Sequence, residues 1–243
     1  MVTVLLHVSA RRRRTSQPIS VALLLKGIAK RILCPYGRGI GRHKEAPVSA
    51  KVTLSKVLGK GFGTLSEYVF HYRRLDGTEG EMCREVYDRG HAAAVLLHNP
   101  TTDKVILVRQ FRPPVMLNGD NPYMLEVVAG LLDGEAPEEC ARREALEEAG
   151  VTVKELERVT AAYGLCAAVT EVLTMFIGTY DDKDRQRGGG LAHEGEDIEV
   201  LEFSLNEAYG MIASGEIMDM KTIVLLQTLV FKRRGMVSGG YPS

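Results

Sequence analysis

The chain has 243 residues, of which 45% are hydrophobic and 26% are charged, and its formal net charge is zero. This size and composition predict a globular protein with one sizeable core, with or without a small appended domain. No apolar run approaches the roughly 20 residues that a helix needs to cross a bilayer, so we expect no membrane-spanning segment. The four cysteines show no C-x-x-C spacing and predict neither a disulfide framework nor a zinc site: Cys34, Cys83, Cys140 and Cys166.

Charge is distributed unevenly along the chain. Residues 1–44 contain ten of the 31 basic residues and none of the 31 acidic ones, so the remaining residues carry a net charge of −10. An acidic body argues against broad binding of nucleic acid. It suits a protein that recruits divalent cations before a phosphorylated ligand.

Residues 1–48 are predicted to form a basic extension. A short amphipathic helix is favoured there by apolar residues at helical spacing: Val21, Leu24, Leu25, Ile28 and Ile32. An Arg-rich, acid-free, amphipathic segment is typical of a mitochondrial transit peptide. The alternatives are a disordered basic extension on a cytoplasmic protein, or a start codon assigned too far upstream.

Short alternating runs predict β-strands from residue 49 onward. An N-terminal β region, residues 49–90, contains predicted strands at 52–58, 68–74 and 81–87, with a hairpin turn at Asp76-Gly77. A second pair is predicted at 92–97 and 104–111, and its apolar runs suit buried central strands. Pro113 and Pro114 are expected to end that pair, and residues 123–129 to form the next strand.

An acidic helix is predicted over residues 137–149, because Pro137 suits the first helical position and Gly150 the left-handed position after the last turn. Glu144 and Glu148 stand four residues apart on one face, with Glu147 beside them. Like charges at this spacing destabilise a helix, whereas a bound cation would turn the repulsion into chelation. All-oxygen ligands select hard ions such as Mg²⁺. The alternative is an ordinary solvated acidic face.

The remaining residues predict strands alternating with helices. Strands are expected at 156–163, 172–179 and 197–203, with a polar, glycine-rich loop at 181–194, and helices at 205–214 and 221–231. Strands interleaved with helices after an all-β start predict an α/β protein, with a mixed sheet and helices on both of its faces.

The acidic helix also carries a recognisable string. Arg143, Glu144, Glu147, Glu148 and Gly150 resemble the R-E-x-x-E-E-x-G core of the Nudix box, with Gly130 and Glu135 ahead of it. Only four residues separate that glycine from that glutamate, one fewer than in the usual box. A surface turn tolerates such a deletion, and the helix keeps its spacing.

Further strings resemble the GDP-mannose pyrophosphatase branch of the Nudix superfamily, which shares the shortened turn. They lie at residues 84–90, 108–112, 169–171, 188–190, 195–202 and 215–222, and the likeness covers about residues 50–232. It implies a Nudix α/β/α sandwich at residues 91–235. It also implies a homodimer in which the N-terminal strands, residues 49–90, cross to the partner.

The resemblance implies a set of site residues. Metal ligands, for Mg²⁺ or alternatively Mn²⁺, fall on the Ala129 carbonyl, Glu144, Glu148 and Glu196, with Glu147 completing the set. Nucleotide-sugar contacts fall on Arg84, Glu85, Arg112, Ala129, Gly130, Leu131, Glu148, Glu171, Glu196 and Lys221. Without the resemblance, Arg84 and Glu85 would be an exposed strand pair, Arg112 a strand end and Lys221 a solvated helix start.

The implied reaction is hydrolysis of a nucleotide sugar at its diphosphate, with GDP-mannose giving GMP and mannose 1-phosphate. Glu196 or Glu194 would be the general base, and Arg143 would orient a glutamate. Two departures from the branch bear on the substrate: Cys83 replaces a common lysine, and residues 165–168 replace a Ser-Pro-Gly-Gly type loop. The alternatives are a hydrolase of ADP-ribose or another nucleotide sugar, and a catalytically idle Nudix module that binds RNA or a protein.

Overall fold

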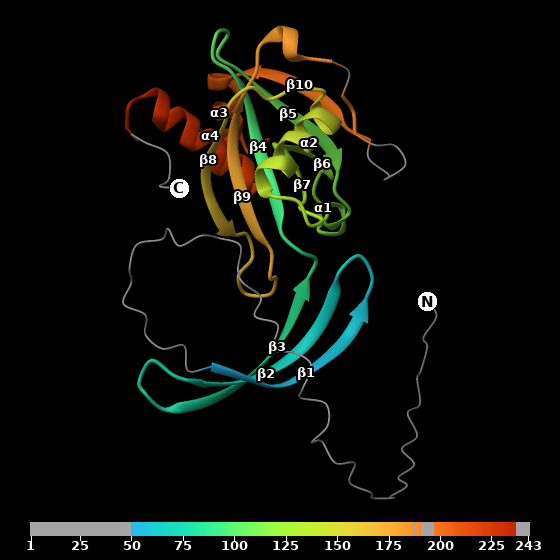
Figure 1. The fold of residues 1–243 in the computed structure, drawn as a ribbon, viewed down its shortest axis with the longest axis vertical. Helices are drawn as coiled ribbons and strands as arrows, with labels where there is room; N and C mark the ends of the chain where they lie inside the picture. The colour runs from blue at the N-terminus through green and yellow to red at the C-terminus, as the bar shows by residue number, and fades with distance from the viewer. Residues whose placement is uncertain (1–49, 187, 191–196, 237–243) are drawn as a thin grey trace, which may run out of the picture. The chain divides into compact units, whose positions relative to one another are not determined.

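Three antiparallel strands form the N-terminal sheet of the computed structural model, which describes residues 50–186, 188–190 and 197–236 (Figure 1). They are β1 (Ala50–Lys60), β2 (Thr64–Arg73) and β3 (Glu79–Asp88), in the order β1-β2-β3. The predicted hairpin at Asp76-Gly77 is confirmed, because β2 pairs with β3 across it and Gly77 has a φ of 87°. The predicted basic extension lies outside the described residues.

The larger sheet is mixed. Its strand order is β10-β5-β4-β9-β8, with β6 paired to β5 and β7 paired to β4. The pair β4–β9 is parallel and the other named pairs are antiparallel. The strands are β4 (Ala92–Asn99), β5 (Lys104–Phe111), β6 (Tyr123–Glu126), β7 (Val128–Leu131), β8 (Leu156–Tyr163), β9 (Val172–Thr179) and β10 (Glu199–Ser204).

Helices cover both faces of this sheet. Alternate residues of β4 show the layering: Ala93 and Val95 share a core with α2 (Pro137–Ala149), whereas Leu96 shares a second core with α3 (Leu205–Ser214) and α4 (Met220–Arg233) (Figure 1). Each fully buried aliphatic side chain contributes about 1.5–3 kcal/mol. The predicted α/β/α sandwich is therefore confirmed, and burial on both faces explains the unbroken apolar run. No helix in the described part of the chain is long and apolar enough to cross a bilayer.

The predicted strand 123–129 is wrong in one respect, because it is two strands. β6 pairs with β5 and β7 pairs with β4, and Val127 lies between them. The Val127 N–H donates to the hydroxyl of Thr222 in α4 at 2.8 Å. A side chain thus satisfies the backbone donor at the point where the chain changes neighbours. Alternation of apolar residues could not reveal this exchange of partners.

The proline pair also does more than end a strand. Pro113 opens a short helix, α1 (Pro113–Leu117), where its missing N–H has no intrahelical partner to lose. A second departure from prediction lies in the loop 181–194, where Asp182–Asp184 form a single 3-10 turn. Both are one-turn elements, too short for a periodic pattern to indicate.

Candidate active site

The acidic helix has the predicted bounds, Pro137–Ala149. Proline occupies its first turn, and Gly150 ends it with φ 66° and ψ 32°. The Gly150 N–H donates to the Leu146 carbonyl at 3.0 Å, which satisfies one of the carbonyls that a helix end leaves without a partner. Local signals alone therefore fix where the carboxylates of this helix stand.

Two of those carboxylates are buried against the sheet. Glu144 is 8% exposed and Glu148 is 2% exposed, whereas Glu138 on the same helix is exposed. The Ala129 N–H donates to Glu148 at 3.3 Å. A Cβ added to Gly130 would stand 1.7 Å from Glu144 Oε1, so this glycine makes room for that carboxylate. A solvated acidic face is therefore excluded for these two side chains.

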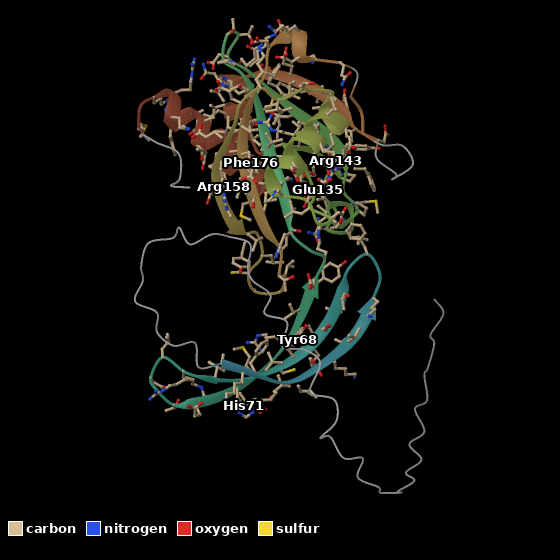
Figure 2. The ribbon with its side chains drawn as sticks, viewed as in Figure 1. Tyr68, His71, Glu135, Arg143, Arg158 and Phe176 are labelled. Atoms are coloured by element: carbon tan, nitrogen blue, oxygen red, sulfur yellow. The ribbon has the colours of Figure 1, made fainter. Side chains whose placement is uncertain are left out.

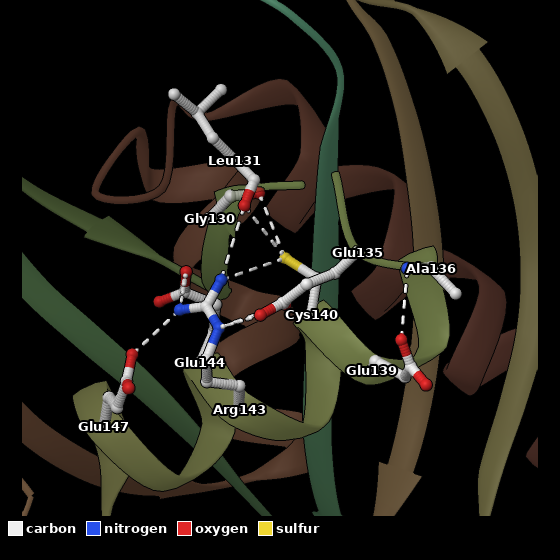
Figure 3. Close-up of polar contacts among 9 residues, drawn as sticks. All are labelled: Gly130, Leu131, Glu135, Ala136, Glu139, Cys140, Arg143, Glu144 and Glu147. Atoms are coloured by element: carbon white, nitrogen blue, oxygen red, sulfur yellow. Dashed lines mark hydrogen bonds and ion pairs between the residues drawn. The ribbon is translucent and has the colours of Figure 1, made fainter. Parts of the chain in front are cut away.

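Arg143 links the turn to the helix. Its Nε donates to both oxygens of Glu135 at 3.1 Å, and its Nη1 donates to Glu144 at 2.8 Å and to Glu147 at 2.9 Å (Figure 3). Figure 2 shows Glu135 and Arg143 together beside the larger sheet. Burial alone would lower the pKa of Arg143, but the hydrogen bond with Glu135 and the charge of Glu144 raise it. Arg143 is therefore a permanent cation that fixes three carboxylates.

Cys140 supports the same turn, a role that its sequence spacing gave no sign of. Its thiol donates to the carbonyl of Leu131 at 3.3 Å and to that of Gly130 at 3.6 Å (Figure 3). Burial, followed by the charge of Glu144, raises the pKa of this thiol to about 11. It therefore stays protonated at neutral pH and keeps its donor.

Arg112 and Lys221, two of the expected substrate contacts, meet at a residue that sequence reasoning missed. Glu126 is 3% exposed and accepts from Arg112 Nε at 2.6 Å and Nη2 at 2.9 Å. Lys221 forms an ion pair with the same carboxylate and with Asp219 at 3.0 Å. In the sequence, the only sign of a role for Glu126 was that it is a single acidic residue within an apolar strand. Arg112 and Lys221 are thus neither a bare strand end nor a solvated helix start.

Glu126 should make the stability of the protein depend on pH. Burial alone would raise its pKa, but the hydrogen bond from Arg112 and the charge of Lys221 outweigh burial and lower it below 4.5. Because its folded-state pKa is depressed, its stabilising contribution is present above about pH 4.5 and is lost as the pH falls through the lowered pKa. We expect urea unfolding to show a smaller loss of stability in Glu126→Gln than in the unaltered protein when the pH is lowered from 7 to about 3, through the range where the contribution of Glu126 is lost. An equal loss in both would contradict this assignment.

Three consecutive glycines, residues 188–190, pack against the C-terminal end of α2. The N–H groups of Gly189 and Gly190 donate to the carbonyls of Glu148 at 2.8 Å and Glu147 at 3.1 Å. A Cβ on Gly188 would stand 2.4 Å from the Ala149 carbonyl carbon. The two candidate bases, Glu194 and Glu196, follow this run in sequence and lie outside the described residues.

Gly188→Ala is expected to destabilise the protein by about 1–3 kcal/mol, because the added methyl must displace backbone rather than a side chain. Gly210→Ala is the matched control. Gly210 lies within α3, and a methyl group added to it would meet no atom within 4 Å, so its replacement should be neutral or stabilising by about 0.4–1 kcal/mol. Urea unfolding measures both variants, and equal stabilities would show that residues 188–190 do not pack closely on α2.

The other expected substrate contacts lie elsewhere. Arg84 and Glu85 are in β3, opposite Tyr68 and Glu67, and Arg84 donates to the Cys83 carbonyl at 2.7 Å. Among the described residues, no hydrogen bond or ion pair joins either of them to α2. Glu171 forms an ion pair with Arg89 at 2.9 Å. The described chain therefore brings together Ala129, Gly130, Glu144, Glu147 and Glu148, and separately Arg112 and Lys221.

The unusual loop at residues 165–168 borders β3. Tyr87 donates its N–H to the Ala168 carbonyl at 2.8 Å and accepts from Thr170 at 3.2 Å. A hollow of about 380 Å³ lies there, lined by Val86, Tyr163 and residues 166–170. A second hollow is lined by residues 99, 101–102 and 181–183. Neither hollow is lined by a residue of α2, so the buried carboxylates lie outside both.

The donor set of the acidic helix suits a hard cation. The carboxylates of Glu144 and Glu148 lie against the backbone of Ala129 and Gly130, and oxygen atoms are the ligands that Mg²⁺ prefers. Within the ranges that the structure describes, no three Asp, Glu, His or Cys side chains form a complete metal-binding group. The third expected carboxylate, Glu196, is outside those ranges.

Comparison with known proteins gives a consistent result. A model of the NUDIX domain matches residues 88–220. The chain is 46% identical over 178 residues to the GDP-mannose pyrophosphatase of Pectobacterium atrosepticum, an alignment that covers 73% of this chain and 92% of the relative. It is 44% identical over 186 residues to the GDP-mannose pyrophosphatase of Salmonella arizonae, covering 75% and 96% of the two chains.

Proposed function

This chain belongs to the Nudix family, and from that premise we propose that it hydrolyses the diphosphate of a nucleotide sugar, with GDP-mannose giving GMP and mannose 1-phosphate. The observation that carries the proposal is the burial of Glu144 and Glu148 against Ala129 and Gly130. Arg143 pairs with Glu144, and two carboxylates buried on one helix face beside backbone oxygen atoms form a donor set that suits a divalent cation. The activity named for the relatives supports GDP-mannose as the substrate.

The Ala129 carbonyl, Glu144 and Glu148 would hold a divalent cation, with Glu196 as a further ligand. Mg²⁺ is our proposed ion, with Mn²⁺ as the alternative, because all of these donors are oxygen atoms. When bound, the ion would neutralise negative charge on the diphosphate. Arg143 keeps Glu144 and Glu147 in place by direct ion pairs.

The remaining residues bind the substrate and handle the proton. Arg112 and Lys221 would contact phosphate oxygens, and the planar guanidinium suits paired contacts. Glu196 or Glu194 would take the proton from the attacking water, and Glu171 with Arg84 and Glu85 would contact the rest of the nucleotide sugar. Water attacks phosphorus, the phosphoric anhydride bond breaks, and each product leaves with a phosphate.

A substrate panel tests this function. Purified protein with Mg²⁺ is given GDP-mannose, ADP-ribose and other nucleotide sugars, and a phosphatase that acts only on the released monophosphates reports cleavage. We expect the highest kcat/KM for GDP-mannose. A preference for ADP-ribose would keep the reaction and change the substrate, the alternative that the replaced loop at residues 165–168 leaves open. Absence of cleavage of every compound would refute the hydrolase assignment.

The rival of another class is a catalytically idle Nudix module that binds RNA or a protein. Its support is the basic segment 1–48, because basic residues bind phosphate backbones. RNA affinity measured with and without residues 1–48 tests it. The hydrolase proposal expects weak RNA binding in both forms, together with turnover in both.

We also propose a homodimer in which residues 49–90 form an arm that packs against the partner. Strand β1 is exposed along its whole length, and its apolar side chains Val52, Leu54 and Val57 are more than half exposed. Exposed apolar groups on an edge strand favour pairing with another chain. Light scattering should give twice the chain mass, and the mass of a single chain would refute the dimer.

Localisation follows from the basic segment. We propose that residues 1–48 direct the protein to mitochondria, because they combine ten basic residues, no acid before residue 45 and an amphipathic pattern. Fusion of this segment to a fluorescent reporter tests import. A cytoplasmic reporter would overturn the proposal without affecting the enzymatic one.

A further inference from the structure

Glu126 is a buried anion between two cations that come from distant parts of the chain. Arg112 follows β5, Glu126 ends β6, and Lys221 lies in the first turn of α4, 95 residues further on. The Glu126 side chain is 4% exposed, that of Lys221 is 14% exposed and that of Arg112 is 39% exposed. The carboxylate is therefore the inner member of the group, and the arginine is its outer member.

The contact with Arg112 fixes the direction of the guanidinium. This group is planar and carries five N–H donors, of which Glu126 takes the one on Nε and one on Nη2. Of the other three, one on Nη1 and one on Nη2 point together from the end edge of the same plane. Anchoring one edge of a rigid plane aims the other, and that edge can bind two phosphate oxygens at once.

The contact with Lys221 brings a second cation to the same place. Its ammonium pairs with both Glu126 and Asp219, and it has three N–H donors in total. Within the described part of the chain, these two contacts leave one donor for a ligand. Two cations held by one carboxylate repel each other less than two cations alone, so Glu126 permits their close approach.

The backbone next to Glu126 is held in a fixed position relative to α4. Its neighbour Val127 donates its N–H to Thr222, whose own N–H donates to the N-cap residue Asp219 at 3.0 Å. Thr222 is fully buried. These contacts join the break between β6 and β7 to the first turn of α4. The carboxylate therefore cannot shift relative to Lys221 without loss of buried hydrogen bonds.

The cluster also lies close to the acidic helix. Glu126 precedes Ala129 by three residues, and Ala129 contacts Glu148. Burial alone would lower the pKa of Arg112, but Glu126 raises it, and the charge of Glu148 adds to that rise. Arg112 therefore lies within electrostatic reach of Glu148, one of the buried carboxylates of α2.

We propose that Glu126 is a positioning residue that aims Arg112 and Lys221 at the diphosphate of the substrate. The inference rests on the proposed function, since it assigns both cations to phosphate oxygens. It adds a third member that contacts no ligand and acts only through the other two.

Glu126→Gln tests the proposal, because loss of charge and loss of positioning change the affinity for inorganic diphosphate in opposite directions. By charge alone, removing an anion from the site should tighten binding of inorganic diphosphate. Loss of positioning should weaken it, by about tenfold on the scale of other residues that orient ligand-binding groups. Isothermal titration calorimetry with inorganic diphosphate in Mg²⁺ measures the affinity. Tighter or unchanged binding by the folded variant would overturn the proposal.

Two further measurements separate positioning from general damage. Affinity for Mg²⁺ alone should stay within about twofold in Glu126→Gln, because its metal-binding carboxylates are on another element, and a parallel loss would indicate structural damage and overturn the proposal. Glu199→Gln is the matched control, since Glu199 pairs with Arg109 of β5 at 2.8 Å on the exposed surface. It should leave diphosphate affinity within about twofold.

The proposal can still be tested if Glu126→Gln does not fold, or if the unaltered protein has no hydrolase activity. If the glutamine variant does not fold, Glu126→Asp keeps the charge but retracts the carboxylate by one methylene. Its diphosphate affinity should fall severalfold, and an unchanged affinity would overturn the proposal. If the unaltered protein cleaves no nucleotide sugar, the proposed function fails, but the diphosphate measurement still reports whether Glu126 positions the two cations.

Discussion

Replacement of Glu148 by glutamine is expected to lower Mg²⁺-dependent turnover by more than about a hundredfold, because losing a residue that merely supports a metal ligand already costs about 10–100-fold. Glu148 is 2% exposed and accepts from the Ala129 N–H. Glutamine keeps the size of the side chain and one acceptor oxygen but removes the charge. The loss should therefore fall on metal binding and turnover rather than on the fold. Steady-state kinetics over a range of Mg²⁺ concentrations measures it.

Glu138→Gln is the matched control for this prediction. It makes the same chemical change on the same helix, at a position exposed to solvent. Its turnover should remain within about twofold of the unaltered protein, since surface substitutions rarely matter. Circular dichroism and thermal unfolding confirm that both variants fold. Activity of Glu148→Gln within about tenfold of the unaltered enzyme would reject Glu148 as a metal ligand.

Arg143→Lys should have the second largest effect, with apparent Mg²⁺ affinity or kcat reduced by about 10–100-fold. A single guanidinium contacts Glu135 through Nε, and Glu144 and Glu147 through Nη1. Lysine keeps the charge, but a compact ammonium cannot reproduce that fork. Glu144 would then lose the group that holds it over Gly130. Titration of activity with Mg²⁺ separates a loss of affinity from a loss of kcat.

Arg142→Lys provides the comparison. Arg142 is the neighbouring residue, exposed and turned about 100° from Arg143 on the helix, and its Nη1 donates to the Val153 carbonyl at 2.6 Å. Its replacement removes one hydrogen bond, worth about 0.5–1.5 kcal/mol of stability, without contact to the carboxylates. Turnover should stay within about threefold of the unaltered protein. Similar losses in both arginine variants would mean that Arg143 acts on stability rather than on the site.

Much of the site could be predicted because its signals are local. Proline at the start and glycine at the end determine the bounds of α2, and the helical period places Glu144 and Glu148 on one face. The resemblance to a Nudix box supplied Gly130, whose missing side chain admits Glu144. The predicted central strands of the sheet were likewise correct, since strands that are buried on both faces have continuous apolar runs.

Other features of the site depend on which segments become neighbours. The spacing of residues around Glu126 gave no sign that it lies between Arg112 and Lys221, which are 14 and 95 residues away. The single predicted strand 123–129 is divided because β6 and β7 pair with different strands. Arg84 and Glu85, by contrast, are exposed in a strand of the N-terminal sheet, as the alternation of residues alone had predicted.

The sequence by itself determined the acidic helix, the alternation of strands and helices, and the chemistry that clustered carboxylates favour. Only the tertiary structure decided that this helix turns two of its acids inward against Ala129 and Gly130, and that Glu126 joins two distant cations. The physical reason is the distance along the sequence over which each effect acts. Helix bounds and side-chain periodicity are set within a few residues, whereas burial and ion pairing depend on the order of strands in the sheet and on the helices that cover it.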